Sequence, residues 1–438
     1  MQYMIVFSIL LAASLSIGSF ILLNLFVKRK KEKSIRALVI QWYKNITGRG
    51  IKLKKAMAIL FLICGSFCYV LFFYNLSNRI IYHREVSGFA EWRESNNQKY
   101  LYVEADDHYS LGYLTGKATA MKIYLMKEFF LIASLSLGLD YSSFIKIGDK
   151  YLSYIPEKYQ DEIRGIAEGA TAGSGFHISF KDALIQSLFF EILYGQSETE
   201  EDQMVACTAF GIKNEDNTTL TGQNMDLVKP MRNFQYFVLH KLKNKPKIFT
   251  YRIGASLAIA MGKSEKNISI IMNLVQIKEK ADILIPSFVT VREGLADSQN
   301  VSEFYDCLFP QAKSPFGLNY IIADGQNIMA IQALPNKISK NYLNDTQIHS
   351  NTYLNKSWKE KLLDPHYSEE RQEYSEEVLH DAYKNGDVTN KELLELLSDE
   401  PVICRDEEGI LGVGSLAFFT SDSFGCGTAN QNVGSIPI

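Results

Sequence analysis

The residue whose type is best suited to chemistry is a cysteine at the start of a short apolar stretch. Cys207 lies in the sequence VACTAF (residues 205–210), and Asp226 lies in LTGQNMDL (residues 220–227). A thiol becomes a nucleophile where a neighbour lowers its pKa or accepts its proton. Both segments have the composition of strands, and a hairpin turn between them would bring Asp226 back beside Cys207. The same pattern also fits a small core residue, because a lone cysteine in a strand is usually only packed.

Further strands in the second half of the chain would place these two residues in a sheet. Short runs rich in β-branched and aromatic residues are bounded by Gly, Asn, Asp and Lys, which is typical of strands and turns. They are residues 219–221, 236–239, 248–253, 269–275, 318–323 and 328–333. Apolar residues recur at helical spacing in other segments. These are 114–132 and 181–193, within a mainly helical region 107–200, and 301–308, 368–385 and 390–397. Separate runs of helices and strands favour an α+β layered sandwich.

The first 79 residues differ in charge from the rest of the chain. They hold 12 lysines and arginines and one acidic residue, a net charge of +11, whereas 34 basic and 48 acidic residues give −14 beyond them. A basic head on an acidic body argues against nucleic-acid binding, which needs a basic domain surface. The overall composition, 47% hydrophobic and 22% charged, predicts a folded core and excludes wholesale disorder.

Two segments of this basic head predict a membrane anchor. Residues 4–27 and 56–76 are uncharged stretches of 24 and 21 residues, long enough to cross a bilayer as helices. The loop between them is strongly basic, so the positive-inside rule predicts that it lies in the cytoplasm. The N-terminus and everything after about residue 80 would then lie on the non-cytoplasmic side. There, Cys404 and Cys426 would either form a disulfide or remain two thiols.

The segments around Cys207 and Asp226 resemble cysteine-type N-terminal-nucleophile hydrolases. The nearest group is the acyl-coenzyme A:6-aminopenicillanic acid acyltransferase family, and bile-salt acylases, penicillin V acylases and acid ceramidase are more distant. The resemblance rests on Cys-Thr followed by Gly-Gln-Asn-x-Asp, with the aspartate 19 residues beyond the cysteine. Further blocks occur in the family's order and cover about residues 95–425. They are HYSLGYLTG (108–116), PEKY (156–159), EIRGIAEG (162–169), SIIMN (269–273), NYIIADG (319–325), HSNTYL (349–354) and SEER (368–371).

The resemblance implies a fold and a maturation step. The fold would be a four-layer αββα sandwich with a helical N-terminal part, preceded by the two transmembrane helices. The precursor would cut its own chain between Ala206 and Cys207. The freed α-amine of Cys207, with a reference pKa near ~7.7–8.0, would then serve as the base for the thiol. The chain would divide into an anchor (1–79), a helical propeptide region (80–206) and a catalytic region (207–438).

The resemblance also implies roles for four further residues. Asn273 and Asn351 match the positions of amides that stabilise the tetrahedral oxyanion. Asp226 would hold the α-ammonium or thiol region in place, and Arg371 would pair with Asp226. Each has a simpler alternative: Asp226 as a turn cap, the two asparagines as turn residues at strand ends, and Arg371 as an exposed helix charge.

The sequence therefore predicts a membrane-anchored, self-processing amidase or N-acyltransferase that acts on a linear amide or acyl thioester through Cys207. Its partners would be the lipid bilayer and the small acyl substrate, with no nucleic acid, and the oligomeric state is left open. The resemblance and the absence of glycine-rich phosphate, zinc or calcium motifs imply no cofactor or metal. Two alternatives remain open: a non-catalytic membrane-bound binding protein with the same fold, and an esterase or phospholipase acting on lipids.

Overall fold

The computed structural model describes the chain from Arg84 onwards, with gaps. The described residues are 84–95, 98–136, 140–196, 205–258, 260–278, 285–308, 316–343, 346–363, 366–384, 386–399 and short stretches between 402 and 437. Both predicted transmembrane segments, 4–27 and 56–76, and Cys404 lie outside them. Within the described part, no helix combines the length and the apolar composition needed to cross a membrane.

Two sheets form the centre of the described structure, which confirms the predicted α+β class. Nine of the described strands form the first sheet, in the spatial order β1-β2-β5-β6-β7-β8-β9-β10-β11. Their bounds are β1 Phe89–Ser95, β2 Gln98–Ala105, β5 Gln235–Leu242, β6 Lys247–Ile253, β7 Met261–Ser264, β8 Ser269–Val275, β9 Gly317–Ala323, β10 Ile328–Leu334 and β11 Lys337–Leu343. All neighbours in this sheet are antiparallel except β2 and β5, which are parallel.

The second sheet faces the first and carries Cys207. Its order is β12-β3-β4-β15-β16-β17, and β14, which pairs with β13, also pairs with β4. The bounds are β3 Val205–Lys213, β4 Thr219–Val228, β12 Thr346–His349, β13 Asp406–Glu407, β14 Ile410–Leu411, β15 Leu416–Phe419, β16 Ser423–Gly427 and β17 Gly434–Pro437. Strands β3 and β4 pack against β8 and β9 of the first sheet, so the main hydrophobic core lies between the sheets.

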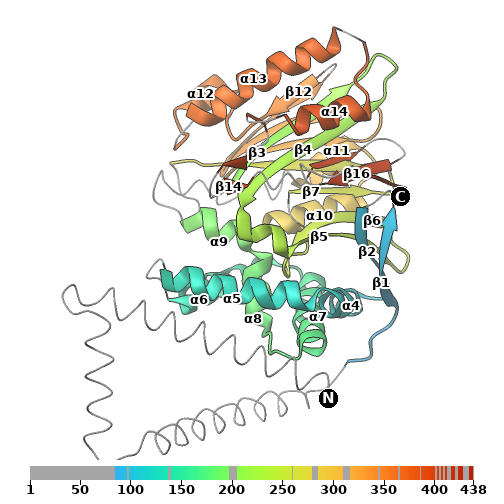
Figure 1. The fold of residues 1–438 in the computed structure, drawn as a ribbon, viewed down its shortest axis with the longest axis vertical. Coiled ribbons are helices and arrows are strands. Elements are labelled where there is room, and N and C mark those ends of the chain that lie inside the picture. The colour runs from blue at the N-terminus through green and yellow to red at the C-terminus, as the bar shows by residue number, and fades with distance from the viewer. Residues whose placement is uncertain are drawn as a thin grey trace, which may run out of the picture. The chain divides into compact units, whose positions relative to one another are not determined.

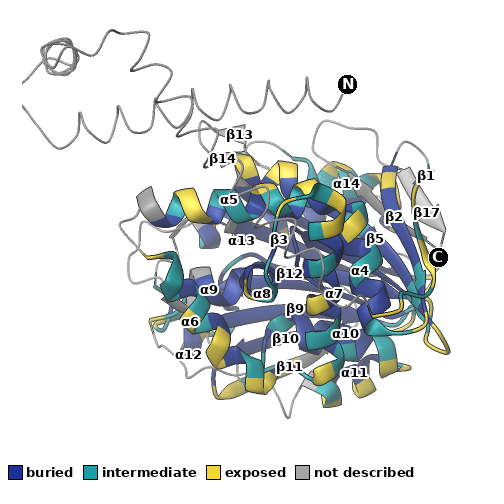
Figure 2. Ribbon diagram, turned by 90° about the horizontal axis from the view of Figure 1, so that it is seen from below, coloured by how far each residue is buried: buried dark blue, intermediate teal, exposed yellow. Residues whose placement is uncertain are grey.

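Helices cover the outer faces of both sheets (Figure 1). On the second sheet lie α13 (His366–Tyr383) and α14 (Asn390–Leu397), whereas α10 (Ser287–Asp297) and α11 (Val301–Leu308) pack on the first. The N-terminal helices are α4 His108–Ala118, α5 Ala120–Ser136, α6 Tyr141–Tyr151, α7 Glu157–Ser174, α8 Phe180–Ser187 and α9 Phe189–Gln196. Helix α12 is the short segment Lys356–Lys359. Figure 2 shows strands that are mostly buried and helices whose outer faces are exposed.

The predicted segments agree with the structure, which also contains elements that were not predicted. Every predicted strand and helix segment falls on an observed strand or helix, although Thr119 and Leu188 divide two of the predicted helices. The strands β1, β2, β7, β11, β12 and β13 to β17 and the helices α10 and α12 were not predicted. The apolar residues of β2 are buried whereas β1 is largely exposed, so β1 lacks the half-buried alternation that marks a strand in sequence. Because β2 pairs with β5, the predicted propeptide region also contributes to the first sheet.

Glycines allow helices α4 and α7 to pack with their backbones in contact. Asp107 caps α4 by accepting a hydrogen bond from the Ser110 amide. A Cβ on Gly112 would overlap the carbonyl of Glu162, and a Cβ on Gly165 would overlap the carbonyl of Tyr109. These obstacles are backbone atoms, which cannot turn aside as a side chain can. The close approach fixes the positions of both helices relative to each other.

We expect Gly165→Ala to destabilise the protein, although alanine favours helix by about 1 kcal/mol over glycine. Separating the two helices should cost about 1–3 kcal/mol, which lowers the melting temperature. The matched control is Gly148→Ala in α6, where the nearest atom to a new Cβ would be the Leu184 side chain at 3.4 Å. Thermal unfolding of the two variants decides the point, and equal melting temperatures would contradict the packing argument.

Candidate active site

The β3–β4 hairpin places Cys207 and Asp226 on neighbouring strands, as the sequence predicted. Cys207 pairs with Met225, and Asp226 pairs with Ala206. The side chain of Cys207 belongs to the core between the sheets, whereas Phe210 belongs to the core beneath α13 and α14. Because side chains alternate along a strand, the thiol and the Asp226 carboxylate leave the sheet on opposite faces. Asp226 therefore lies beside the peptide bond that precedes Cys207 rather than beside the thiol.

The sheet ends on one side just before it reaches Cys207. Strand β12 pairs with β3 only from Ile212 to Ala209, where His349 is its last paired residue. The main-chain groups of Cys207 on that side therefore face no strand, and a buried N–H or C=O must find another partner. Side chains supply these partners, and they come from three of the residues predicted by resemblance.

Asn351 binds the nitrogen of Cys207. It follows β12 in the chain, and its Oδ1 accepts a hydrogen bond of 2.7 Å from the Cys207 amide. Its Nδ2 donates to the carbonyl of Leu274 at 2.6 Å, which fixes the orientation of the side-chain amide. Asn351 is partly exposed, whereas Cys207 and Asn273 are buried. Among the described residues of the site, Asn351 therefore marks the side that solvent reaches.

Asn273 and Arg371 bind the carbonyl oxygen of Cys207. From β8, Asn273 Nδ2 donates to this oxygen at 3.4 Å and also to the carbonyls of His349 and Ser350. From α13, Arg371 Nη1 donates to the same oxygen at 2.6 Å. Arg371 Nη2 donates to Asn351 Oδ1 at 2.8 Å. One guanidinium thus connects the two main-chain contacts of Cys207, and Arg371 is buried rather than an exposed helix charge.

The pairing of Arg371 with Asp226 stays a prediction. The contacts of Arg371 described above lie at Cys207 and Asn351, with further donation to Thr208 Oγ1 and Ser368 Oγ. Asp226 is buried and acts electrostatically on Cys207, where its charge raises the thiol pKa. The structure thus brings all four predicted partners to the neighbourhood of Cys207.

Burial controls the protonation of the thiol in the uncut chain. It raises the pKa of Cys207 to about 12, against the opposing effect of the Arg371 charge. Asp226 raises the pKa further, and hydrogen bonds from Asn351 and Gln223 lower it. The thiol is therefore protonated at neutral pH. In the uncut chain the nitrogen of Cys207 is an amide, which is not a base, so a free α-amine would supply a group that the site lacks.

Two positioning residues were not predicted from the sequence. Gln223 Nε2 donates to Asn273 Oδ1 at 2.9 Å, which fixes the direction of the Asn273 amide. Asn319 Nδ2 donates to the carbonyls of Ser350 and Thr352 at 3.2 and 2.7 Å, which holds the loop that carries Asn351. In the sequence, Asn319 belongs to the block 319–325, for which no catalytic role was predicted. For Asn319 the signal is a single amide within a strand of otherwise apolar residues, whereas Gln223 lies in a strand that also contains Asn224 and Asp226 and gives no such signal.

We expect Arg371→Lys to destabilise the protein by about 2 kcal/mol or more, because lysine has one nitrogen in place of the two that separately bind the Cys207 carbonyl and Asn351. The control is Arg164→Lys on the exposed side of α7, where a change within about 0.5 kcal/mol is expected. Chemical unfolding measures both. An Arg371→Lys protein as stable as the Arg164→Lys protein would show that the network does not order the site.

Comparison with known proteins gives one family match. Residues 212–419 match the model of the family described as acyl-coenzyme A:6-aminopenicillanic acid acyl-transferase. The matched range contains Asp226, Asn273, Asn351 and Arg371, and it begins just after Cys207. No curated protein matches the sequence.

Solved structures give weaker similarities. One is an N-acylethanolamine-hydrolyzing acid amidase ortholog from Caenorhabditis elegans, with 15% identity and a TM-score of 0.38, covering 48% of this chain and 92% of that one. Two variants of a conjugated bile acid hydrolase from Clostridium perfringens have 15% and 14% identity and TM-scores of 0.38 and 0.39. Each of these covers 53% of this chain and 92% of the other. The site described above rests on the residues of this chain alone.

Proposed function

We propose that the protein is a self-processing cysteine amidase or N-acyltransferase, on the premise that residues 212–419 match the model of the acyl-coenzyme A:6-aminopenicillanic acid acyl-transferase family. The observation that supports the proposal best is the set of side chains on the main chain of Cys207. Asn351 binds its nitrogen, and Asn273 and Arg371 bind its oxygen. In a cysteine that only fills a core, a neighbouring strand would ordinarily bind these main-chain groups, whereas here three polar side chains bind them.

The first step is cleavage of the precursor. The Cys207 sulfur attacks the carbonyl carbon of Ala206, and the peptide nitrogen leaves with the thiol proton, which gives a thioester. Water then hydrolyses the thioester, so that Ala206 ends in a carboxylate and Cys207 carries a free amine and a thiol. Asp226, beside Ala206 in the register, would hold the new ammonium group. The amine can accept the thiol proton near neutral pH because its reference pKa is near ~7.7–8.0.

The second step is acyl transfer from the substrate. The thiolate attacks the carbonyl carbon of an amide or thioester, and the leaving amine or thiol takes a proton. Asn351 Nδ2 makes one described hydrogen bond, to Leu274, and an amide nitrogen carries two hydrogens, so one remains for the oxyanion. Asn273 Nδ2 contacts three main-chain carbonyls and serves mainly to hold Cys207 and the Asn351 loop. Water or an amine then releases the acyl group.

The proposal extends to the organisation of the chain. The two facing sheets and their outer helices support a four-layer αββα N-terminal-nucleophile sandwich. We propose an anchor in residues 1–79, a propeptide region in 80–206 and a catalytic region in 207–438. The uncharged segments 4–27 and 56–76 and the basic loop between them support a two-pass anchor with the site on the non-cytoplasmic side. A lipidic N-acyl substrate would suit that location.

The direct test of the proposal is a denaturing gel with N-terminal sequencing. The 438-residue chain of 49.7 kDa would separate into fragments of roughly 23 and roughly 26 kDa, the second beginning Cys-Thr-Ala-Phe. Cys207→Ala should remain one intact chain and lose turnover of N-acyl amides and acyl thioesters. Cys307→Ala, at the partly buried second free cysteine among the described residues, is the control and should be processed normally. Turnover by Cys207→Ala would contradict the proposal.

Membrane topology can be tested with reporter fusions to the C-terminus of the full chain in a bacterial inner membrane. We expect a fused alkaline phosphatase to be active and a fused green fluorescent protein to be non-fluorescent. The reason is that the basic loop is expected in the cytoplasm and the C-terminus on the non-cytoplasmic side. Replacing the basic residues of the loop by glutamine is the control and should weaken the preference. The reverse pattern of reporter activity in the parent would exclude the proposed orientation.

A further inference from the structure

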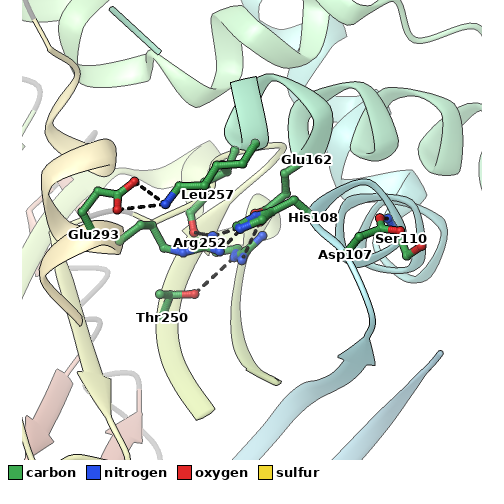
Figure 3. A network of polar contacts seen from close by, with 10 residues as sticks. Asp107, His108, Ser110, Glu162, Thr250, Arg252, Leu257 and Glu293 are labelled. Atoms are coloured by element: carbon green, nitrogen blue, oxygen red, sulfur yellow. Dashed lines mark hydrogen bonds and ion pairs between the residues drawn. The ribbon is translucent and has the colours of Figure 1, made fainter. Parts of the chain in front are cut away.

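A buried cluster of charges lies far along the chain from the nucleophile, between the N-terminal helices and the first sheet (Figure 3). Glu162 of α7 is 0% exposed. Arg292 of α10 binds it with two hydrogen bonds, Nη1 to Oε1 at 2.9 Å and Nη2 to Oε2 at 3.0 Å. Arg252 of β6 reaches Oε1 at 3.4 Å, and His108 Nδ1 of α4 lies 2.8 Å from Oε2. One carboxylate is therefore the common partner of groups from three other elements.

The surroundings make this carboxylate indispensable to the cluster. Arg252 and Arg292 are both buried, so each guanidinium needs an anion or several acceptors. Arg252 Nε donates to Thr250 Oγ1, and Arg292 Nη1 also donates to the carbonyl of Leu257. Burial alone would raise the pKa of Glu162, but the two arginines and His108 outweigh it and hold this pKa well below its usual range. The carboxylate thus stays ionised, and removing its charge would leave two buried cations without the anion that they share.

The cluster has a particular position relative to the proposed cut. Glu162 and His108 precede Cys207 in the chain, whereas Arg252 and Arg292 follow it. We infer that Glu162 is the electrostatic lock between the two chains of the processed protein, with the second chain supplying Arg252 and Arg292 as its partners. This inference rests on the proposed self-cleavage, because in an uncut chain the same contacts lie within one molecule.

Packing explains why the lock is rigid. The glycine contacts between α4 and α7 hold His108 and Glu162 at a fixed separation. The ring of Tyr159, also from α7, lies under the guanidinium of Arg292 at 5.4 Å. Because this packing already restricts the Glu162 and Arg292 side chains, forming their ion pair costs little additional side-chain entropy. A two-pronged carboxylate–guanidinium contact of this kind is both strong and specific.

The neighbouring ion pair between the same helices provides a matched comparison. Lys158 of α7 lies 2.7 Å from Glu293 of α10, so it also connects residues on both sides of the cut. Its two side chains are 40% and 18% exposed, whereas those of Glu162 and Arg292 are 0% and 2% exposed. Solvent weakens an exposed pair, so of these two ion pairs we expect only the buried one to contribute appreciably to holding the chains together.

The test separates the lock from the self-cleavage itself. The full chain, in detergent micelles, carries Cys207→Ala and a site-specific protease sequence in place of residues 198–203, so the cut is made by the added protease. An affinity tag at the C-terminus retains the second chain, and release of the first chain is followed in increasing urea. Because no self-cleavage is needed, failure of the proposed function would leave this measurement intact.

We expect Glu162→Gln to speed release of the first chain about a hundredfold, whereas Lys158→Gln should change it less than about threefold. The same variants before protease treatment show by near-ultraviolet circular dichroism whether they fold. If Glu162→Gln does not fold, Arg292→Lys replaces it, with about tenfold faster release expected because the charge remains and the two-pronged contact is lost. Release from Glu162→Gln at the parent rate, or equal release from Lys158→Gln and the buried variant, would overturn the inference.

Discussion

The end of the sheet beside Cys207 is the constraint on which the proposed site depends. Strand β12 stops at His349, opposite Ala209, so the next main-chain groups of β3 have no neighbouring strand on that side. A buried N–H and C=O cannot be left without partners. Asn351, Asn273 and Arg371 take the place of the missing strand. The main chain of Cys207 is thus held by hydrogen bonds, as it would be in a sheet. On this edge of β3, however, its neighbour is the partly exposed Asn351 instead of a strand.

This substitution of side chains for a strand gives the site a dual use. A strand pairing would bind the nitrogen of Cys207 as an amide and would leave no space for a substrate. A single carbonyl oxygen on Asn351 accepts from an amide before cleavage and can accept equally from an amine after it. The hydrogen bond that aligns the precursor therefore also aligns the proposed base. Arg371 keeps Asn351 in place in both states, because its own contact is to the same Oδ1 atom.

Strand composition alone predicted the local part of this site, the hairpin around Cys207, but not the distant residues that contact it. The strand composition on either side of Cys207 predicted the hairpin that brings Asp226 to its neighbouring strand. Asn273, Asn351 and Arg371 lie on a different sheet, a loop and a helix, and periodicity says nothing about which distant residues meet, so only the family resemblance pointed to them. Gln223 and Asn319 were missed because the local pattern does not show that a polar residue in a strand is buried. Gln223 orients the Asn273 amide, and Asn319 holds the main chain of the loop that carries Asn351.

The N-terminal half shows a second case in which a local pattern concealed a long-range role. The glycines and the carboxylate of residues 162–169 resemble a family block, yet their spacing alone indicates only a helix that packs closely. The partners of Glu162 are on β6 and α10, beyond the proposed cut. Strand β2 crosses the same boundary by pairing with β5, so backbone hydrogen bonds hold the edge of the sheet while charge holds the helical layer. A chain cut at the proposed site would have to keep its two parts together without the peptide bond, and a buried carboxylate between two arginines is a contact to which both parts contribute.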